Sequence, residues 1–499
     1  MEHFTSFLDG FAVALAPVNL GYAFLGCIMG TVVGVLPGLG PAAGMALLIP
    51  ATFGMEPASA IIMLAGLYYG AQYGGSTTSI LINTPGEASS IMTTLDGYRM
   101  AQNGRGGAAL AVSAIGSFIA GTISVILLSL LAVPLSHFAL KIGPAEYFAL
   151  LLFSMASVTS LTGSSLPKAA FAVFLGLMLS SIGIDLQSGT ARFTAGVLEL
   201  QDGVGFIVAA VGLFAISEVL VTLEQVMKGE TQIVGVSGSL WLTREEWRRS
   251  RMPILRGSLI GFFKGILPGG GATIATILSY SLERGLSKQP ELFGTGMIEG
   301  VAGPETANNA AATGAFVPLL ALGLPGSAST AILLGAFLIY GIQPGPELFA
   351  KNPDVVWGLI DSMYIGNVIL FVLNLPLIML FVRILYVPAG ILMPLVLVVA
   401  GIGVYSLNES MVELYLALGF GALGYVMRKL SIPIPPLVLS IILGSLLEKS
   451  LRQSMTISGG DLGFLVGSPI AASLLFLSVL VFAIPFIPWR RQSSEHGAQ

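Results

Sequence analysis

Two stretches decide the fold: Gly34-Val35-Leu36-Pro37-Gly38-Leu39-Gly40 and Gly265-Ile266-Leu267-Pro268-Gly269-Gly270-Gly271. Five of their seven positions are identical, and the copies lie 231 residues apart. A second pair follows, because Pro85-Gly86-Glu87-Ala88-Ser89-Ser90 recurs as Pro325-Gly326-Ser327-Ala328-Ser329-Thr330 at an offset of 240. Proline removes a backbone donor, and both proline and glycine disfavour helix. Each copy is therefore predicted to interrupt a helix.

The composition around these motifs is that of a membrane protein. The chain has 499 residues, of which 55% are hydrophobic and 10% charged, and its mean hydropathy is +0.88. Soluble domains average about 25% charged residues. Apolar runs near the ~20 residues that cross a bilayer recur along the whole length. The sequence predicts an all-α polytopic membrane protein.

The basic residues are unevenly placed. No Lys or Arg precedes Arg99, whereas a mid-chain cluster and a C-terminal pair are strongly basic: Lys228, Arg244, Arg248, Arg249, Arg251 and Arg256, then Arg490 and Arg491. Basic loops stay in the cytoplasm. We therefore expect the central loop and the C-terminus in the cytoplasm and the N-terminus on the periplasmic side.

The duplication extends beyond the two motif pairs. Residues 212–220 resemble residues 444–451, again near an offset of 232. This spacing predicts an N-terminal transmembrane repeat over 1–226, a basic cytoplasmic loop over 227–254 and a C-terminal repeat over 255–455. Residues 456–499 are left as an extra transmembrane helix and a cytoplasmic tail. If each repeat crosses the membrane an odd number of times, the two repeats are inverted, as in many secondary transporters.

The first motif pair has a functional and a structural interpretation. A broken helix in hydrocarbon is tolerated only beside a cavity or inside protein. Its free N–H groups attract a carboxylate, and its unwound carbonyl groups can coordinate a cation. The alternative is a kink or a tight helix crossing, and two copies at matching positions favour function. The candidate substrate-binding residues are Pro37, Gly38, Gly40, Pro268, Gly269 and Gly270.

The second pair adds hydroxyl groups next to a Pro-Gly break. A helix that begins there has free amides and side-chain donors at its first turn. The pattern predicts re-entrant hairpins whose tips meet near the membrane midplane. The alternative is that Ser and Thr hydrogen-bond between helices. The candidate residues are Asn83, Thr84, Pro85, Gly86, Ser89, Ser90, Pro325, Gly326, Ser327, Ser329 and Thr330.

Ionisable and amide groups inside a membrane suggest function because they are costly to bury. Glu305 and Asn309 share one helix face at a spacing of four residues, and Asn308 is adjacent. We treat these three as candidates for coupling to Na⁺ or a proton; the alternative is an interfacial loop with solvated glutamates. Glu87 is expected at a wet hairpin tip, and Asp96 in a polar connection.

Other site chemistries find no support in the sequence. The three histidines are scattered, so no metal site beyond Na⁺ and no cofactor is expected. Zinc-protease, nucleophile-elbow and Walker A motifs are absent, which argues against an enzyme and against ATP as the energy source. No nucleic-acid partner is expected either.

These motifs resemble those of a known family along essentially the whole chain. The matching stretches are 34–41, 83–90 through 95–98, 265–273, 299–309, 323–327, 341–346, 434–439 and 460–461. The chain resembles the large membrane subunit of the tripartite tricarboxylate transporters, the TctA family. The resemblance implies carboxylate uptake across the bacterial inner membrane, with a periplasmic binding protein and a small transmembrane subunit as partners. It also implies energy from a Na⁺ or proton gradient and, by analogy, an elevator-like mechanism.

The expected function is the large permease subunit of a cation-gradient-driven importer of tri- or dicarboxylates. Two alternatives from other classes stay open. One is a passive carboxylate or anion channel, which needs the same hydroxyl-lined breaks. The other is a membrane scaffold that transports nothing. The shared motifs do not name the carboxylate.

Overall fold

The computed structural model describes residues 2–161, 165–185, 188–228, 236, 238–267 and 271–483. Their α-helices are α1 (Glu2–Ala14), α2 (Pro17–Val35), α3 (Gly40–Leu48), α4 (Pro57–Leu81), α5 (Ile91–Met100), α6 (Gly106–Ala139), α7 (Pro144–Leu161), α8 (Leu166–Ser180), α9 (Phe206–Ala210), α10 (Ser217–Lys228), α11 (Arg244–Ile266), α12 (Gly271–Leu286), α13 (Glu299–Gly314), α14 (Phe316–Leu322), α15 (Ala328–Ile339), α16 (Leu348–Lys351), α17 (Pro353–Asn374), α18 (Ile378–Val382), α19 (Ala389–Asn408), α20 (Met411–Lys429), α21 (Ile434–Ile457) and α22 (Pro469–Ala483). Two short strands of two residues each, β1 (Gly183–Ile184) and β2 (Ala191–Arg192), pair antiparallel, with Gly183 opposite Arg192.

Seven helical stretches of the described residues are long and apolar enough to cross a membrane. They are Pro17–Val35, Ala88–Ala139, Phe206–Glu224, Pro353–Asn374, Gly390–Asn408, Met411–Lys429 and Ile434–Ile457. The prediction of an all-α polytopic membrane protein is therefore confirmed. Several further helices are shorter, because glycine and proline interrupt them at the duplicated motifs.

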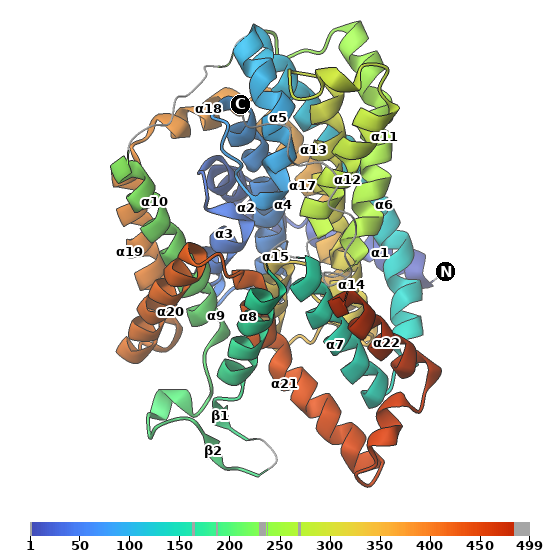
Figure 1. Ribbon diagram of the computed structural model, residues 1–499, viewed down its shortest axis with the longest axis vertical. Helices are drawn as coiled ribbons and strands as arrows, with labels where there is room; N and C mark the ends of the chain where they lie inside the picture. Colours follow the sequence, from blue (N-terminus) through green and yellow to red (C-terminus); the bar gives the residue numbers. More distant parts are fainter. Residues whose placement is uncertain are drawn as a thin grey trace.

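Two closely packed helix pairs, α2 with α4 and α11 with α13, build the core of the molecule; α4 and α13 are its buried members, and α11 lies toward one side (Figure 1). In the first pair, glycines 26, 30 and 34 of α2 lie against the backbone of residues 63, 67 and 71 of α4. A side-chain carbon at any of these glycines would collide with the facing carbonyl group. Such small-residue stripes let membrane helices approach backbone to backbone.

The second pair repeats this packing. Glycines 257, 261 and 265 of α11 lie against residues 303, 307 and 311 of α13 in the same way. The glycines are offset by 231 residues from those of α2, and the facing residues by 240 from those of α4. These are the offsets of the two motif pairs in the sequence. The duplication is thus present in the helix packing as well as in the motifs.

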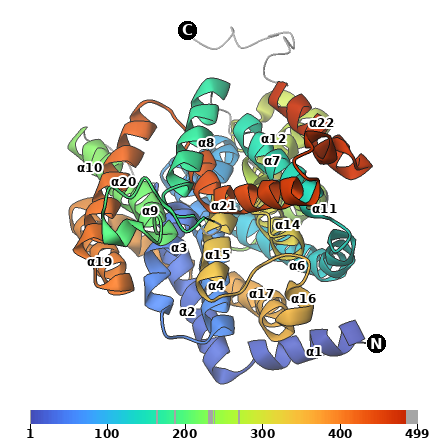
Figure 2. The same ribbon diagram turned by 90° about the horizontal axis from the view of Figure 1, so that it is seen from below.

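Two outer groups of helices flank this core, and each mixes the two halves of the chain (Figures 1 and 2). In one group, α7 and α8 pack against α21. In the other, α9 continues through residues 211–216 into α10, and this segment packs against α19 and α20. The third pair of similar stretches, residues 212–220 and 444–451, also occupies comparable positions. Gly212 of the first faces α20, and Gly444 of the second faces α8. Each outer group thus contains helices from both halves of the chain.

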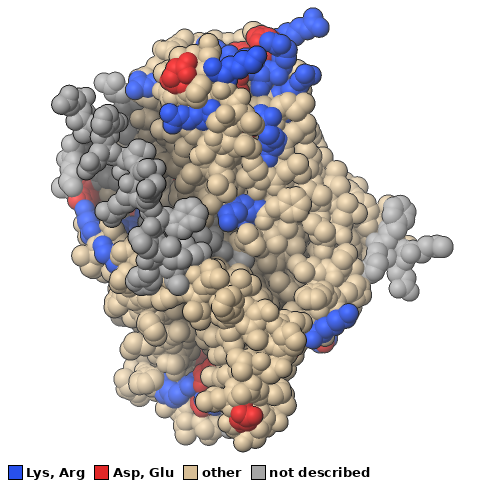
Figure 3. Space-filling model, turned by 45° about the vertical axis from the view of Figure 1, so that its right-hand side comes forward, with Lys and Arg blue, Asp and Glu red and all other residues tan. Residues whose placement is uncertain are grey.

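Charged side chains gather mainly at one end of the molecule, with a broad uncharged region below them on the face in Figure 3. Four of the mid-chain arginines, Arg244, Arg248, Arg249 and Arg251, stand on the first turns of α11, which begins with a capping box between Thr243 and Glu246. Arg105 pairs with Glu246 at 2.6 Å, so the connection after α5 and the start of α11 lie together. Arg490 and Arg491 lie outside the described residues.

Asp96 of α5 corrects a sequence interpretation. It is fully buried rather than placed in a polar connection. Its Oδ1 accepts the backbone N–H groups of Gly294, Gly296 and Met297 at 2.7–2.9 Å, and its Oδ2 accepts the hydroxyl of Tyr280 at 2.9 Å. A carboxylate satisfied by several donors tolerates burial. Asp96 therefore fastens the segment before α13 to the first half of the chain.

Candidate substrate cavity

The first motif breaks a helix in both halves. Helix α2 ends at Val35, Gly38 has a left-handed φ of 86°, and α3 begins at Gly40. Helix α11 ends at Ile266, and α12 begins at Gly271. The residue after each first helix leaves the helix with the same geometry, φ −84° and ψ 112° at Leu36 and φ −80° and ψ 125° at Leu267. Pro268, Gly269 and Gly270 lie outside the described residues.

The second motif forms a helix N-terminus in both halves, which we call the first and second tips (residues 85–90 and 325–330). The N-cap residues Glu87 and Ser327 share one extended conformation, with φ −151° in both and ψ 167° and 170°. Three residues later, the hydroxyl groups of Ser90 and Thr330 accept the N-cap N–H groups at 3.3 and 2.8 Å. These are capping boxes, which satisfy free amides at a helix start.

Each tip lies against the first break of its own half. A side-chain carbon at Gly86 would meet Gly75 and the carbonyl group of Gly34. The same atom at Gly326 would meet Ala315 and the carbonyl group of Gly265. At Gly86 this approach requires glycine, because the added carbon would collide with Gly75 Cα, whereas at Gly326 the space is tight, at 3.3 Å from Ala315 Cβ. The two motifs of each half therefore build one local structure. Helix α3 extends from the structure of the first half and α15 from that of the second, and both lie near the middle of the long axis in Figure 1.

The breaks and tips of both halves surround one cavity of about 530 Å³. Its lining includes segments 38–43, 86–89, 271–273 and 326–329, together with residues of α4, α20 and the start of α21. Of the sequence candidates, Gly38, Gly40, Gly86, Ser89, Gly326, Ser327 and Ser329 line it. The four motifs that the sequence singled out, far apart along the chain, thus meet around a single space.

One basic and one acidic side chain line this cavity among the described residues, Arg428 of α20 and Glu87 of the first tip. Arg428 forms an ion pair with Glu218 of α10, whose side chain is 5% exposed. The Nε of Arg428 is buried without a hydrogen-bond partner among the described residues. Glu218 in turn fills the space beside Gly38, where a side-chain carbon would collide with its carboxylate. The guanidinium group is thereby held next to the first break.

The three cation candidates of α13 have separate surroundings. Glu305 is fully buried and accepts hydroxyl hydrogen bonds from Ser76, Thr93 and Ser113, the last at 2.8 Å. Asn309 donates to Ser117 at 2.6 Å, and Asn308 donates to Glu87 at 3.0 Å. The alternative of a solvated interfacial loop is wrong, because this segment is a buried helix. Of the three, Asn308 alone contacts a described residue that lines the cavity.

The remaining candidates shape the tips rather than line the cavity. Ser90 and Thr330 are buried and form the capping boxes. Asn83 is exposed with a left-handed φ of 55° and turns the chain after α4. Pro37 lies in the first break, Thr84 precedes the first tip, and Pro85 and Pro325 begin the two tips, next to lining residues.

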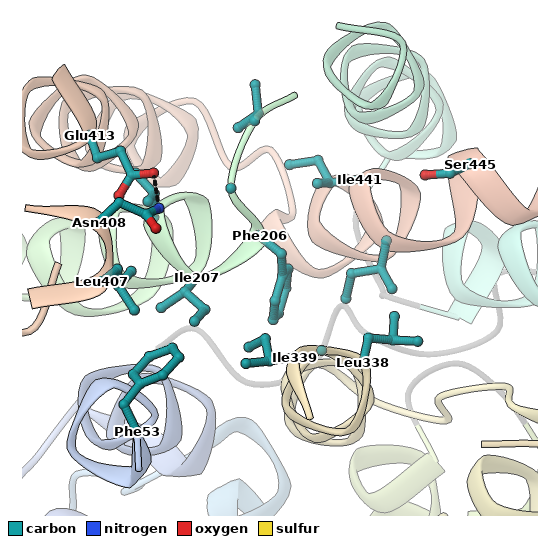
Figure 4. A pocket seen from close by; sticks show the side chains of 15 residues that line it. Phe53, Phe206, Ile207, Leu338, Ile339, Leu407, Asn408, Glu413, Ile441 and Ser445 are labelled. Carbon is teal, nitrogen blue, oxygen red and sulfur yellow. Dashed lines mark hydrogen bonds between the residues drawn. The ribbon is translucent and has the colours of Figure 1, made fainter. Parts of the chain in front are cut away.

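A second cavity of about 500 Å³ lies between Phe53, the start of α9, α15 and α21 (Figure 4). Its lining is mostly apolar, and Asn408 donates to Glu413 at 2.6 Å on one side of it. No basic side chain is among its described lining residues. Among the described lining residues, a basic side chain is therefore present in the first cavity and absent from this one.

Residues 20–439 match the model of the tripartite tricarboxylate transporter TctA family. The chain belongs to this family. It is also 47% identical over 486 residues to an uncharacterized 52.8 kDa protein of the TAR-I ttuC' 3' region of Agrobacterium vitis, with 97% of each chain covered. A second uncharacterized protein, of the TAR-II ttuC' 3' region, is 47% identical over 235 residues, which are 47% of this chain and 97% of that protein. No solved structure matches the chain.

Sequence reasoning about this TctA-family chain missed several cavity residues, namely Tyr68, Gln72, Thr273 and Arg428. Arg428 stands at the end of an apolar run, where a basic residue normally reports orientation. Tyr68 and Gln72 are one turn apart on α4, a signal that could have marked a polar face leading to the tip. Glu87 lies at the first tip, where the sequence placed it, and is half-buried with Asn308 of α13 as a hydrogen-bond partner.

Proposed function

We propose that this chain is the large permease subunit of a tripartite, cation-gradient-driven importer of di- or tricarboxylates. A periplasmic binding protein would deliver the carboxylate, and a small transmembrane subunit would complete the complex. One observation carries the proposal: the broken helices of both halves surround a cavity that contains Arg428. Family membership supports it.

The chemistry of the cavity suits a carboxylate. Helices α12 and α15 begin at its wall, so their positive dipole ends, and those first-turn N–H groups that the capping box of α15 does not use, face an anion there. Arg428 offers the fork geometry that carboxylates bind in a bidentate way. Ser327 and Ser329 add hydroxyl donors. Breaks in membrane helices of this kind form the substrate sites of many secondary transporters.

The membrane orientation is part of the same proposal. The end that carries Arg105 and the first turns of α11 would face the cytoplasm by the positive-inside rule. The N-terminus would then be periplasmic, and the C-terminus cytoplasmic in the bacterial inner membrane. The two halves would be inverted repeats, and their central helix pairs would move as an elevator against the outer groups. A Na⁺ or proton gradient would supply the energy, with the polar residues of α13 beside the coupling ion.

Binding to the purified full chain tests the proposal. Citrate, succinate and phthalate should raise its thermal unfolding temperature, and Arg428→Gln should abolish that shift. Arg256→Gln is a matched control, because Arg256 pairs with the buried Glu283 as Arg428 pairs with Glu218, with side chains 36% and 2% exposed against 32% and 5%. A membrane scaffold would show no shift with any carboxylate.

Uptake separates a transporter from a passive channel. Cells that express the chain with its partner subunits should accumulate labelled carboxylate only while a cation gradient exists. Dissipating the Na⁺ and proton gradients together should stop accumulation. Flux that persists without either gradient would contradict the proposal and favour the channel.

A further inference from the structure

The first tip carries an acid where a carboxylate would bind. Glu87 is the N-cap residue of this tip, and it lines the cavity together with Arg428. The equivalent residue of the second tip is Ser327, which has the same backbone conformation and no charge. An acid is therefore not needed to build a tip. Of two tips with the same backbone conformation, only the first carries an acidic N-cap residue.

Glu87 is held firmly in this position. Asn308 of α13 donates to its Oε1 at 3.0 Å. The Gln72 amide of α4 also faces its carboxylate and lies 3.1 Å from Oδ1 of Asn308. The Glu87 side chain also passes close to Gly75: a side-chain carbon at Gly75 would lie 3.7 Å from Cγ of Glu87. The Asn308 donor and the facing Gln72 amide, from two helices, place the carboxylate at the cavity wall.

The charged and titratable groups around Glu87 come from three elements. Tyr68 of α4 and Arg428 of α20 line the same cavity. Glu305 of α13 lies one turn from Asn308, but three hydroxyl groups enclose it, and it does not line the cavity. Arg428 already has Glu218 as its partner. Arg428 is thus one positive charge against two carboxylates, Glu218 and Glu87, so this group is net negative among the described residues before a negative substrate enters.

We propose that Glu87 couples carboxylate binding to a monovalent cation, Na⁺ or a proton, which must neutralise its side chain before the anion is held. The inference rests on the proposed function and names its coupling residue. Like charges repel more strongly in a low-dielectric cavity than in water. Because linkage is reciprocal, the bound cation would raise carboxylate affinity, and the bound carboxylate would raise cation affinity by the same factor.

The test measures carboxylate affinity of the purified full chain in two series. One varies Na⁺ at fixed pH, and the other varies pH without Na⁺. In the wild type we expect affinity to rise by at least about tenfold along one of the series, which identifies the cation. In Glu87→Gln, affinity should already be high and should not change along either. A Glu87→Gln protein that keeps the full cation dependence would overturn the inference.

Three further variants keep the test decisive. Glu87→Ser reproduces the residue of the second tip, whose backbone already accommodates serine, and should behave as Glu87→Gln does. Glu413→Gln is a matched control, because Glu413 also lines a cavity beside an amide donor, Asn408 (Figure 4). It should keep the cation dependence of the wild type. Loss of that dependence in Glu305→Gln with retention in Glu87→Gln would place coupling at Glu305 and overturn the inference.

The outcome also separates this inference from the proposed function. If neither the wild type nor Glu87→Gln binds any of the three carboxylates under any condition, the proposed function fails and the inference falls with it. If both bind with equal cation dependence, carboxylate recognition stands and the role of Glu87 is refuted.

Discussion

The two tips have the same backbone and different chemistry. Both place an extended N-cap residue after Pro-Gly, and both close it with a hydroxyl group three residues later. Yet the N-cap residue is Glu87 in one and Ser327 in the other, and both line the cavity. The fold therefore uses the same N-cap conformation at both tips, but an acidic side chain stands at only one of them. The shared backbone builds the cavity wall, and the side chain of Glu87 is what distinguishes the two tips in chemistry.

The largest expected effect concerns the glycine stripes that hold both tips in place. Gly30→Leu should abolish folding, because the backbone of α4 faces that position directly, and overpacking a fixed contact costs ~1–3 kcal/mol or more. Gly261→Leu, its counterpart on α11, should do the same. Size-exclusion profiles of detergent-solubilised protein measure this loss. Gly21→Leu on α2, where nothing lies within 4 Å, is the control. Folding of only one of the two stripe variants would contradict the equivalence of the halves.

Adding the missing acid to the second tip should have the next largest effect. Ser327→Glu would place a second carboxylate in the cavity, and carboxylate affinity should fall by about one hundredfold when two cations must bind instead of one. Isothermal titration of citrate, succinate and phthalate measures it. Ser327→Asn is the control, since Asn is an equally good N-cap and carries no charge. Equal losses in both variants would show that capping, not charge, matters there.

The two asparagines of α13 allow a finer comparison. Asn308→Ala and Asn309→Ala each remove one hydrogen bond, so each should lower the free energy of unfolding by roughly 1–3 kcal/mol. Only Asn308→Ala should also alter the cation dependence of carboxylate binding, because Asn308 holds Glu87. Thermal unfolding and the two binding series measure these effects. A changed cation dependence in Asn309→Ala alone would move the coupling site away from the first tip.

The smallest expected effect is at the caps themselves. Ser90→Ala and Thr330→Ala each remove a capping hydroxyl, which typically lowers stability by about 1 kcal/mol. The two decreases in thermal unfolding temperature should be similar, because the two capping boxes are equivalent. A decrease at one tip several times larger than at the other would reveal a difference in the backbones that their matched dihedral angles do not predict.

The breaks themselves could be predicted from the sequence, because proline and glycine act locally on the backbone. Leu36-Pro37-Gly38 therefore located the end of α2 to within a residue or two. The partners of the buried groups could not be predicted in this way. Asp96 is satisfied by N–H groups some 200 residues further along the chain. Arg428 reaches the cavity because α20 packs on a segment of the first half. Such pairings depend on tertiary packing, which leaves no spacing signal in the chain.

The exchange of the last helices between the two halves has a consequence for biosynthesis. Helices α7 and α8 are synthesised early, but the helix that covers them, α21, emerges from the ribosome only near the end of synthesis. Until then, the faces of α7 and α8 that later contact α21 must be covered by lipid or by an insertion factor. This outer group therefore cannot be completed before α21 is made, and a chain truncated before Ile434 would lack the helix that completes it.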